Sequence, residues 1–249
     1  KELGIFNKYF QESFFKSLLV NNYGKKYFQI IKKKNLKILV LTKFHKLFME
    51  ELGIASEKIE VLPNYLNVSS AKKNQKKENY IVYAGRISKE KGVEEVIRAY
   101  KEANKENLQL KIIGNGPELE SLKKKYNLNN VEFEGELENK EVLKIIQESK
   151  AVITGTKLYE GQPTLLCEAS LMGIPSIFPR VGGISEFFPN DYKLSFEEFN
   201  YDDLKKKIEI IDNTEKRHQE GSKAKDHIKK LLDKEELFNK FEKVLSEFK

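Results

Sequence analysis

Two glutamates eight residues apart flank a Gly-Gln-Pro step in the stretch LYEGQPTLLCEA, residues 158–169. Glu160 precedes this step in a segment typical of a loop, and Glu168 lies in an apolar run typical of a helix. A proline at the first helical position leaves the following N–H groups, those of Thr164 and Leu165, without partners inside the helix. Such a helix start favours a bound phosphate, through its free N–H groups and through the helix dipole.

The two carboxylates need a different partner, because a negative phosphate repels them. We expect the helix to begin at Pro163, with Glu168 further along it and Glu160 approaching from the loop before it. In these positions both are suited to accept hydrogen bonds from sugar hydroxyls. Two hydroxyl-bearing rings on either side of a diphosphate describe a nucleotide-sugar.

Two basic residues support the prediction that the ligand contains a diphosphate. Arg86 and Lys91 fall in GRISKEKG (85–92), between Gly85 and Gly92, directly after a β-rich run. Arginine offers a forked contact and lysine a compact charge. Because loops at the carboxyl ends of parallel strands meet at one edge of a sheet, both side chains are expected to converge on the same diphosphate.

The elements that must position these loops alternate regularly from residue 80 onward. Apolar strands are predicted at 79–85, 108–114, 131–135, 151–154, 175–179 and 192–195, and helices at 93–103, 117–127, 141–149 and from Pro163. Alternation of this kind predicts an α/β fold: a doubly wound, Rossmann-like parallel sheet with helices on both faces.

The segment before residue 80 has a different pattern. A long helix is predicted at about 7–33, then strands at 37–42 and 58–64 around a helix at 43–53. Two strands are too few for an independent α/β sheet. We therefore predict a remnant of a first Rossmann-like domain at 1–66, a polar linker at 67–79, and a ligand-binding domain at 80–249. The C-terminal helices are expected to pack back toward the first domain.

Composition narrows the function classes. The formal charge of +7 comes from scattered lysine clusters, which we interpret as a solvated surface rather than a nucleic-acid site, because no nucleic-acid motif accompanies them. No apolar run approaches the ~20 residues of a membrane span. The single cysteine, Cys167, excludes an internal disulfide, favours a reducing cytoplasmic setting and is expected in the core.

Five motifs then carry a family resemblance. In this order, GRISKEKG, IIGNGPE, FEGELEN, EGQPTLLCEA and GGISE resemble family 4 glycosyltransferases of the two-domain GT-B fold. The resemblance covers about residues 80–190, and residues 42–64 look like the end of that family's first domain. It identifies the fold as GT-B type, with an incomplete first α/β domain before a complete second one.

The resemblance implies a retaining, metal-independent hexosyltransferase without a cofactor. Its donor is a UDP- or GDP-sugar and its acceptor a glycan or lipid-linked molecule, as in cell-surface polysaccharide synthesis. Arg86 and Lys91 would bind the diphosphate, Glu160 the donor sugar and Glu168 the ribose, with Glu160, Arg86 and Lys91 as the catalytic set. The base would lie against Leu137 and Asn139. The remaining donor-binding positions that it implies are Gly85, Gly114, Gly161, Gln162, Pro163, Thr164 and Leu165.

One departure from the family keeps two alternatives open. The family's first domain supplies a glycine-rich loop and most acceptor contacts, and residues 1–62 are too short to provide them. The chain is thus expected to be a fragment that binds donor without efficient turnover. A non-catalytic nucleotide-sugar binding module and a GT-B sugar-nucleotide epimerase are the alternatives. The aromatic and basic residues of 1–34 fit either a peripheral contact at the inner face of a membrane or a helix separated from its packing partners.

Other interpretations of single motifs are weaker. Glu160 and Glu168 would also suit surface acids or a glycosidase pair, but neither explains Arg86 and Lys91. GNGP (114–117) is not a dinucleotide fingerprint, because Leu119 stands where that motif needs glycine. Gly182 and Gly183 fit a chain turn or a close approach to the donor equally well, and the following Glu186 is expected to be structural.

Overall fold

The computed structural model describes residues 13–33, 36–68, 78–105 and 107–247. The chain divides into two compact units, which we describe separately. The smaller unit contains the described residues of 13–40 and 45–61, and the larger contains Leu41–Phe44 and the described residues from Leu62 onward. Most of the predicted linker, residues 69–77, and the start of the predicted first helix, residues 7–12, lie outside the described residues.

The smaller unit is built on a pair of parallel strands, in which Ile38 lies opposite Ile59. Its small core consists of Ile31, Val40, Ile54 and Ile59. The two predicted strands are thus confirmed, although each is shorter than expected. The elements in this part of the chain are α2 (Phe14–Lys33), β1 (Ile38–Val40), α3 (Lys43–Glu51), η1 (Ser56–Lys58) and β2 (Ile59–Val61).

The larger unit is built on a parallel sheet in the order β5-β4-β3-β6-β7-β8. Counted along the chain from β3, this is the order 3-2-1-4-5-6 of a doubly wound sheet. The order reverses between β3 and β6, so the crevice between their carboxyl ends is where such sheets bind ligands. The strands are β3 (Tyr80–Ala84), β4 (Gln109–Ile113), β5 (Val131–Gly135), β6 (Ala151–Ile153), β7 (Ser176–Pro179) and β8 (Ser195–Phe196).

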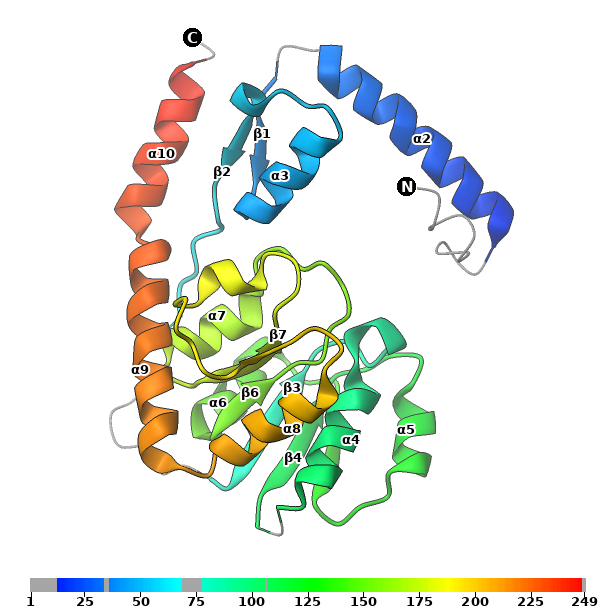
Figure 1. Cartoon of the computed structure of the whole chain (residues 1–249), viewed down its shortest axis with the longest axis vertical. Coiled ribbons are helices and arrows are strands. Elements are labelled where there is room, and N and C mark those ends of the chain that lie inside the picture. Colours follow the sequence, from blue (N-terminus) through cyan, green and yellow to red (C-terminus); the bar gives the residue numbers. More distant parts are fainter. Residues whose placement is uncertain (1–12, 34–35, 69–77, 106, 248–249) are drawn as a thin grey trace. The chain divides into compact units, whose positions relative to one another are not determined.

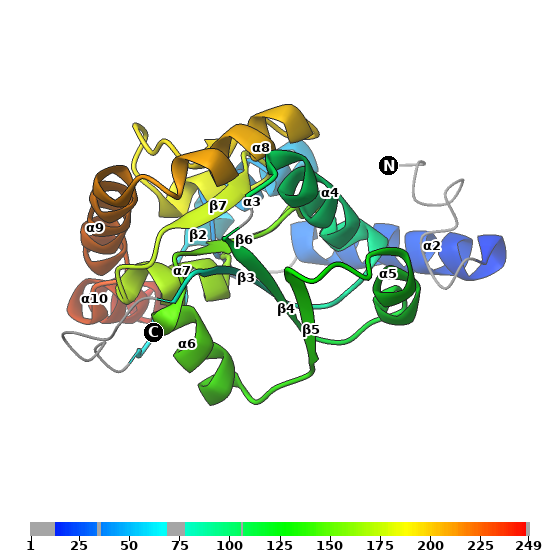
Figure 2. The ribbon, with the colours of Figure 1, turned by 90° about the horizontal axis from the view of Figure 1, so that it is seen from below.

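Helices cover both faces of this sheet, as predicted. Figure 2 shows α4 and α8 on one side of the strands and α6 and α7 on the other. Along the chain, α9 packs on α7 and leads into α10 (Figure 1). The helices of this unit are α4 (Val93–Ala103), α5 (Leu119–Lys125), α6 (Asn139–Glu148), α7 (Thr164–Leu171), α8 (Tyr201–Ile210), α9 (Thr214–Leu231) and α10 (Lys234–Ser246).

The core explains why these runs form strands. Ile81 and Val82 of β3 and Val152 of β6 are fully buried, as expected for strands covered on both faces. Burying each such side chain stabilises the fold by about 1.5–3 kcal/mol. Helix α4 begins and ends at the predicted residues, and its buried side chains recur at helical spacing, as at Val93, Val96 and Ile97.

Several predicted boundaries are wrong. The last strand is Ser195–Phe196 rather than 192–195, and the helix predicted at 117–127 is Leu119–Lys125. Tyr192 is not part of the strand, and its hydroxyl bonds to the backbone N–H and carbonyl of Ser176. Helix α7 begins at Thr164, and Pro163 precedes it in a non-helical conformation. None of the described helices is both long enough and apolar enough to cross a membrane.

Candidate functional site

The candidate site lies where the loops that follow β3 and β6 meet. These strands are neighbours in the sheet and run parallel, with Ile81 opposite Ala151 and Val82 opposite Val152. Their loops, residues 85–92 and 154–163, therefore emerge side by side at the point where the strand order reverses. The first loop contains the predicted Arg86 and Lys91, and the second contains Glu160.

Glycine brings the two loops into backbone contact. A Cβ atom on Gly92 would lie 1.9 Å from the Gly155 carbonyl oxygen, and one on Gly155 would lie 2.6 Å from the Gly92 oxygen. Gly92 also has a φ of +64°, a left-handed conformation that favours glycine. The Lys157 N–H donates to the Glu90 carbonyl oxygen at 2.9 Å. No larger residue fits between these loops without moving them.

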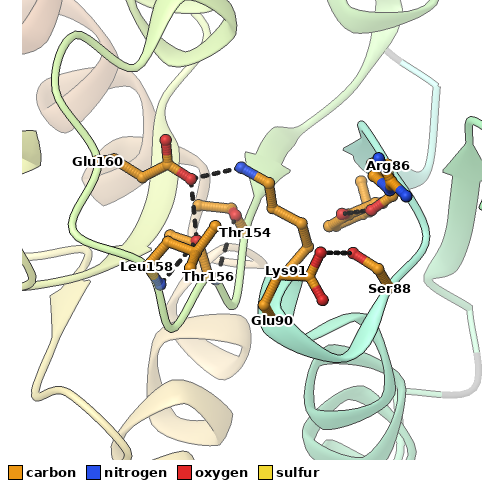
Figure 3. Close-up of polar contacts among 9 residues, drawn as sticks. Arg86, Ser88, Glu90, Lys91, Thr154, Thr156, Leu158 and Glu160 are labelled. Atoms are coloured by element: carbon orange, nitrogen blue, oxygen red, sulfur yellow. Dashed lines mark hydrogen bonds and ion pairs between the residues drawn. The ribbon is translucent and has the colours of Figure 1, made fainter. Parts of the chain in front are cut away.

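This contact sets Lys91 beside Glu160. The Lys91 Nζ lies 2.5 Å from Glu160 Oε1, and the Thr156 hydroxyl donates to the same oxygen at 3.0 Å (Figure 3). The side chains of Lys91 and Glu160 are 30% and 28% exposed, so both remain accessible to a ligand. A cation and a carboxylate thus face the crevice together.

Arg86 lies on the same loop, with its side chain exposed. Its carbonyl oxygen accepts a hydrogen bond from the buried Tyr83 hydroxyl at 2.8 Å. Burial raises the pKa of Tyr83, and the carboxylates of Glu160 and Glu90 raise it further, so the hydroxyl stays protonated and able to donate. No motif in the sequence indicates this role of Tyr83.

A cavity of about 690 Å³ opens beside Arg86, and a smaller one of about 160 Å³ opens beside Glu160. Ala84 and Leu165 line both. Of the predicted donor-binding residues, the larger cavity is lined by Gly85, Arg86, Gly114, Leu137, Asn139 and Leu165. The smaller is lined by Lys91, Glu160, Gln162, Pro163, Thr164 and Leu165. Gly161 and Glu168 are not among the lining residues of either cavity.

Gly114 also has a packing role. Its φ is +134°, and a Cβ atom there would lie 2.0 Å from the Gly85 carbonyl oxygen. The loop after β4 therefore rests directly on the start of the loop after β3. Gly114 lines the cavity because the two backbones touch at this point.

Helix α7 points its N-terminus at the smaller cavity. The first backbone hydrogen bond that Pro163 accepts from the helix comes from the Cys167 N–H, at 3.0 Å, and no side chain of the described residues caps this end. The N–H groups of Thr164 and Leu165 precede that bond. The start is one residue later than predicted, but the N–H groups expected to face a ligand are the same.

Glu168 lies further along α7, partly buried, and accepts a hydrogen bond from the Asn139 side chain. Burial raises the pKa of the Glu168 carboxyl, and the Asn139 bond offsets part of that shift. Glu168 and Asn139, which were predicted to contact the ribose and the base respectively, are thus hydrogen-bonded to each other. Cys167 is fully buried, as predicted, and burial raises the pKa of its thiol.

Gln162 has a partner that the sequence did not indicate. Its Oε1 accepts from the Asn64 N–H at 2.7 Å, and its Nε2 donates to the Asn64 carbonyl oxygen at 2.9 Å. The amide borders the smaller cavity but is committed to the Asn64 backbone.

The turn at Gly182 and Gly183 packs on the backbone of Glu160. A Cβ atom on Gly182 would lie 2.8 Å from the Glu160 carbonyl oxygen, and the Gly183 N–H donates to that oxygen at 2.8 Å. Glu186 accepts hydrogen bonds from the N–H groups of Lys43 and Phe44, both at 2.7 Å. Its predicted structural role is confirmed.

Comparison with known proteins identifies the family. Residues 67–227 match the family described as Glycosyl transferases group 1. The chain belongs to this family.

Two relatives show how the chain compares in length with other proteins of this kind. It is 26% identical over 253 residues to the uncharacterized glycosyltransferase MJ1069 of Methanocaldococcus jannaschii, an alignment that covers 94% of this chain and 64% of the relative. It is 25% identical over 174 residues to a 41.2 kDa protein in the cps region of Klebsiella pneumoniae, which covers 66% of this chain and 47% of the relative. The chain thus spans less than two thirds of the length of either relative.

Solved structures confirm the fold class. The crystal structure of TarM superposes with a TM-score of 0.77 at 21% identity, over 89% of this chain and 45% of TarM. Anabaena HepE, in complex with UDP and glucose, superposes with a TM-score of 0.78 at 15% identity, over 90% of this chain and 66% of HepE. The glycosyl transferases group 1 chain has the predicted α/β fold of the GT-B type.

Among the described residues of this family member, no group of three or more His, Cys, Asp or Glu side chains is arranged to hold a metal ion. The ligand roles of the site residues remain predictions.

Proposed function

We propose that this chain is the donor-binding part of a retaining hexosyltransferase that uses a UDP- or GDP-sugar. The observation that carries the proposal is the Lys91–Glu160 pair beside the uncapped N-terminus of α7, at the switch point of a doubly wound sheet. One cation and one helix start suit a diphosphate, and the adjacent carboxylate suits the hydroxyls of the sugar attached to it. The family match and the HepE likeness support this choice.

In this proposal, the diphosphate is held by Arg86, Lys91 and the N–H groups of Thr164 and Leu165. When the bond from the sugar to the diphosphate breaks, negative charge develops on the leaving phosphate oxygens. Positive groups fixed in advance around those oxygens lower the barrier, and we assign this as the main contribution to catalysis. Both side chains approach from the loop after β3, and the helix start approaches from the loop after β6.

Glu160 accepts hydrogen bonds from the hydroxyls of the donor sugar. Glu168 binds the ribose together with Asn139, and the base lies against Leu137 in the larger cavity. Its volume of about 690 Å³ is in the range of small-molecule sites. The backbone around Gly161 completes the sugar pocket.

We also propose that the reaction is metal-independent. The cations that a diphosphate needs are supplied by Arg86 and Lys91, and the helix end adds a partial positive charge. The acceptor is a glycan or a lipid-linked molecule, and the setting is the cytoplasm, at the inner face of a membrane where the acceptor is lipid-linked. We place this reaction in cell-surface polysaccharide synthesis, as the motif resemblance implies.

Calorimetry with UDP and GDP tests the binding site. The wild-type chain should bind at least one of them without added metal, and Arg86→Ala and Glu168→Ala should each weaken that affinity about tenfold or more. The exposed Glu141→Gln, on α6 and outside both cavities, is the matched control. Unchanged binding in both site variants would move the site elsewhere.

Incubation with UDP-glucose, UDP-N-acetylglucosamine and GDP-mannose tests the reaction. Slow release of free sugar, or transfer to an added glycan, is the expected result. Tight binding with no release from any donor would favour the non-catalytic binding module.

A further inference from the structure

We propose that Thr156 is a positioning residue for Glu160. The Thr156 hydroxyl holds one carboxylate oxygen of Glu160, so that the other oxygen is directed toward the donor sugar. The proposal rests on the function assigned to Glu160 above. Thr156 lies in the loop after β6, four residues before Glu160, and only 4% of its surface is exposed. Thr156 lines the smaller cavity beside Glu160, but little of its surface is open to a ligand.

The hydrogen bonds of Thr156 fix the direction of its hydroxyl proton. The Leu158 N–H donates to the Thr156 Oγ1 at 3.3 Å, and the Thr156 N–H donates to the Thr154 Oγ1 at 3.4 Å. A threonine hydroxyl has a single proton. With its oxygen accepting from Leu158, that proton is directed to Glu160 Oε1 at 3.0 Å (Figure 3).

Both contacts of the Glu160 carboxylate fall on the same oxygen. Oε1 receives the Thr156 hydroxyl and the Lys91 ammonium, whereas Oε2 receives no hydrogen bond from the residues that the structure describes. The backbone of Glu160 is held separately by the Gly183 N–H. The carboxylate is therefore anchored through one oxygen, with the other left to accept from a ligand.

Thr156 and Lys91 differ in how firmly they can hold this oxygen. Lysine has a long, flexible side chain, and the proposed function gives Lys91 a second task at the diphosphate. The threonine side chain is short, β-branched and buried, so few rotamers are open to it. When Lys91 turns to the diphosphate, Thr156 is the contact that keeps Glu160 in place.

The test compares Thr156→Val, which has the same shape without a hydroxyl, with Thr156→Ser, which keeps the hydroxyl. Calorimetry measures the dissociation constants of UDP and UDP-glucose, and of GDP and GDP-mannose. Thr156→Val should bind the nucleotide-sugar about 5–10-fold more weakly, and the nucleoside diphosphate within about twofold of wild type. Thr156→Ser, which keeps the hydroxyl, should restore most of the sugar-dependent affinity, whereas a purely structural role of Thr156 would weaken the binding of both ligands alike.

Two outcomes would overturn the proposal: an unchanged ratio of the two affinities in Thr156→Val, which includes an equal loss for both ligands, or a serine variant as weak as the valine one. If the wild-type chain binds no nucleotide, the proposed function fails, and the contact is then tested without ligand. The unfolding temperatures of Thr156→Val, of Glu160→Met, which lacks the acceptor oxygens, and of the double variant should be non-additive by about 2 °C. Additive shifts would show that the hydroxyl does not hold the carboxylate.

Discussion

Glu160 and Glu168 lie eight residues apart, and their surroundings are opposite in kind. Glu160, in the loop after β6, contacts the Lys91 ammonium and the Thr156 hydroxyl. Glu168, on α7, is partly buried and has the neutral Asn139 amide as its hydrogen-bond partner, so that burial raises the pKa of its carboxyl. The loop gives Glu160 a cationic partner, whereas burial on the helix makes a charged carboxylate at Glu168 costly.

This difference shows which of the two glutamates has a role in the stability of the fold and which does not. An ion pair at a loop contact contributes to stability, if only modestly where it is partly exposed. A carboxylate placed where its charge is disfavoured does not help the fold, and such positions are characteristic of functional groups. The raised pKa of Glu168 thus adds a second sign of a binding site to the one given by the Lys91–Glu160 pair.

The largest expected effect is on turnover, and it is expected for Glu160 rather than Glu168. Glu160→Gln keeps the size of the side chain but removes the charge facing Lys91. We expect donor hydrolysis or transfer to fall about 100-fold, a size typical of losing one transition-state contact. Affinity for UDP or GDP should stay within about threefold, since neither contains the sugar. A variant with wild-type turnover would remove Glu160 from the catalytic set.

A smaller effect is expected on the cationic side of the pair. Lys91→Ala should weaken UDP or GDP binding about tenfold, because it removes a charge-assisted contact to the diphosphate. Lys89→Ala, an exposed lysine of the same short helical turn, is the matched control and should bind normally. Calorimetry at low and high salt should show the Lys91 effect shrinking with salt. Equal losses in both variants would indicate a diffuse surface-charge effect rather than a specific contact.

The smallest expected effect is on the thermal stability of a Glu168 variant. Its direction tests whether burial disfavours the charge at Glu168. The raised pKa of Glu168 means that the folded chain holds this proton more tightly than the unfolded chain. The stabilisation that this bound proton gives the fold is present near and below pH 4.5, the ordinary pKa of a glutamate. It is lost as the pH rises through the pKa of Glu168 in the folded chain. Glu168→Gln should therefore unfold at a slightly higher temperature than wild type at neutral pH, with the gap closing toward acid. A variant less stable than wild type at neutral pH would contradict this assignment.

Much of the fold could be predicted from the sequence, because strands buried on both faces leave plain apolar runs. The last strand was misplaced, since its register against β7, with Phe178 opposite Ser195, is set by the tertiary structure. The charged residues of the site could be predicted from their loops. The roles of Gln162 and Tyr83 could not: Gln162 is paired with Asn64, 98 residues away, and such a partner is set by the tertiary structure.

The role of Thr156 could not be predicted from the sequence either, although Thr156 and Glu160 are close in the chain. Its spacing of four residues from Glu160 has no meaning in an irregular loop, where no periodicity relates the two side chains. The backbone contact between Gly92 and Gly155 helps to bring Lys91 to the carboxylate that this hydroxyl also meets. Sequence patterns therefore predict the charges of the site better than the contacts that orient them.

The buried Cys167 has a practical consequence for watching this site at work. It is the only cysteine among the 249 residues, and its thiol is fully covered. A maleimide dye applied to the folded protein should therefore label a newly introduced surface cysteine with little background. A single label placed at Lys89 would report directly on the loop after β3 while nucleotides are added, without first removing a native thiol.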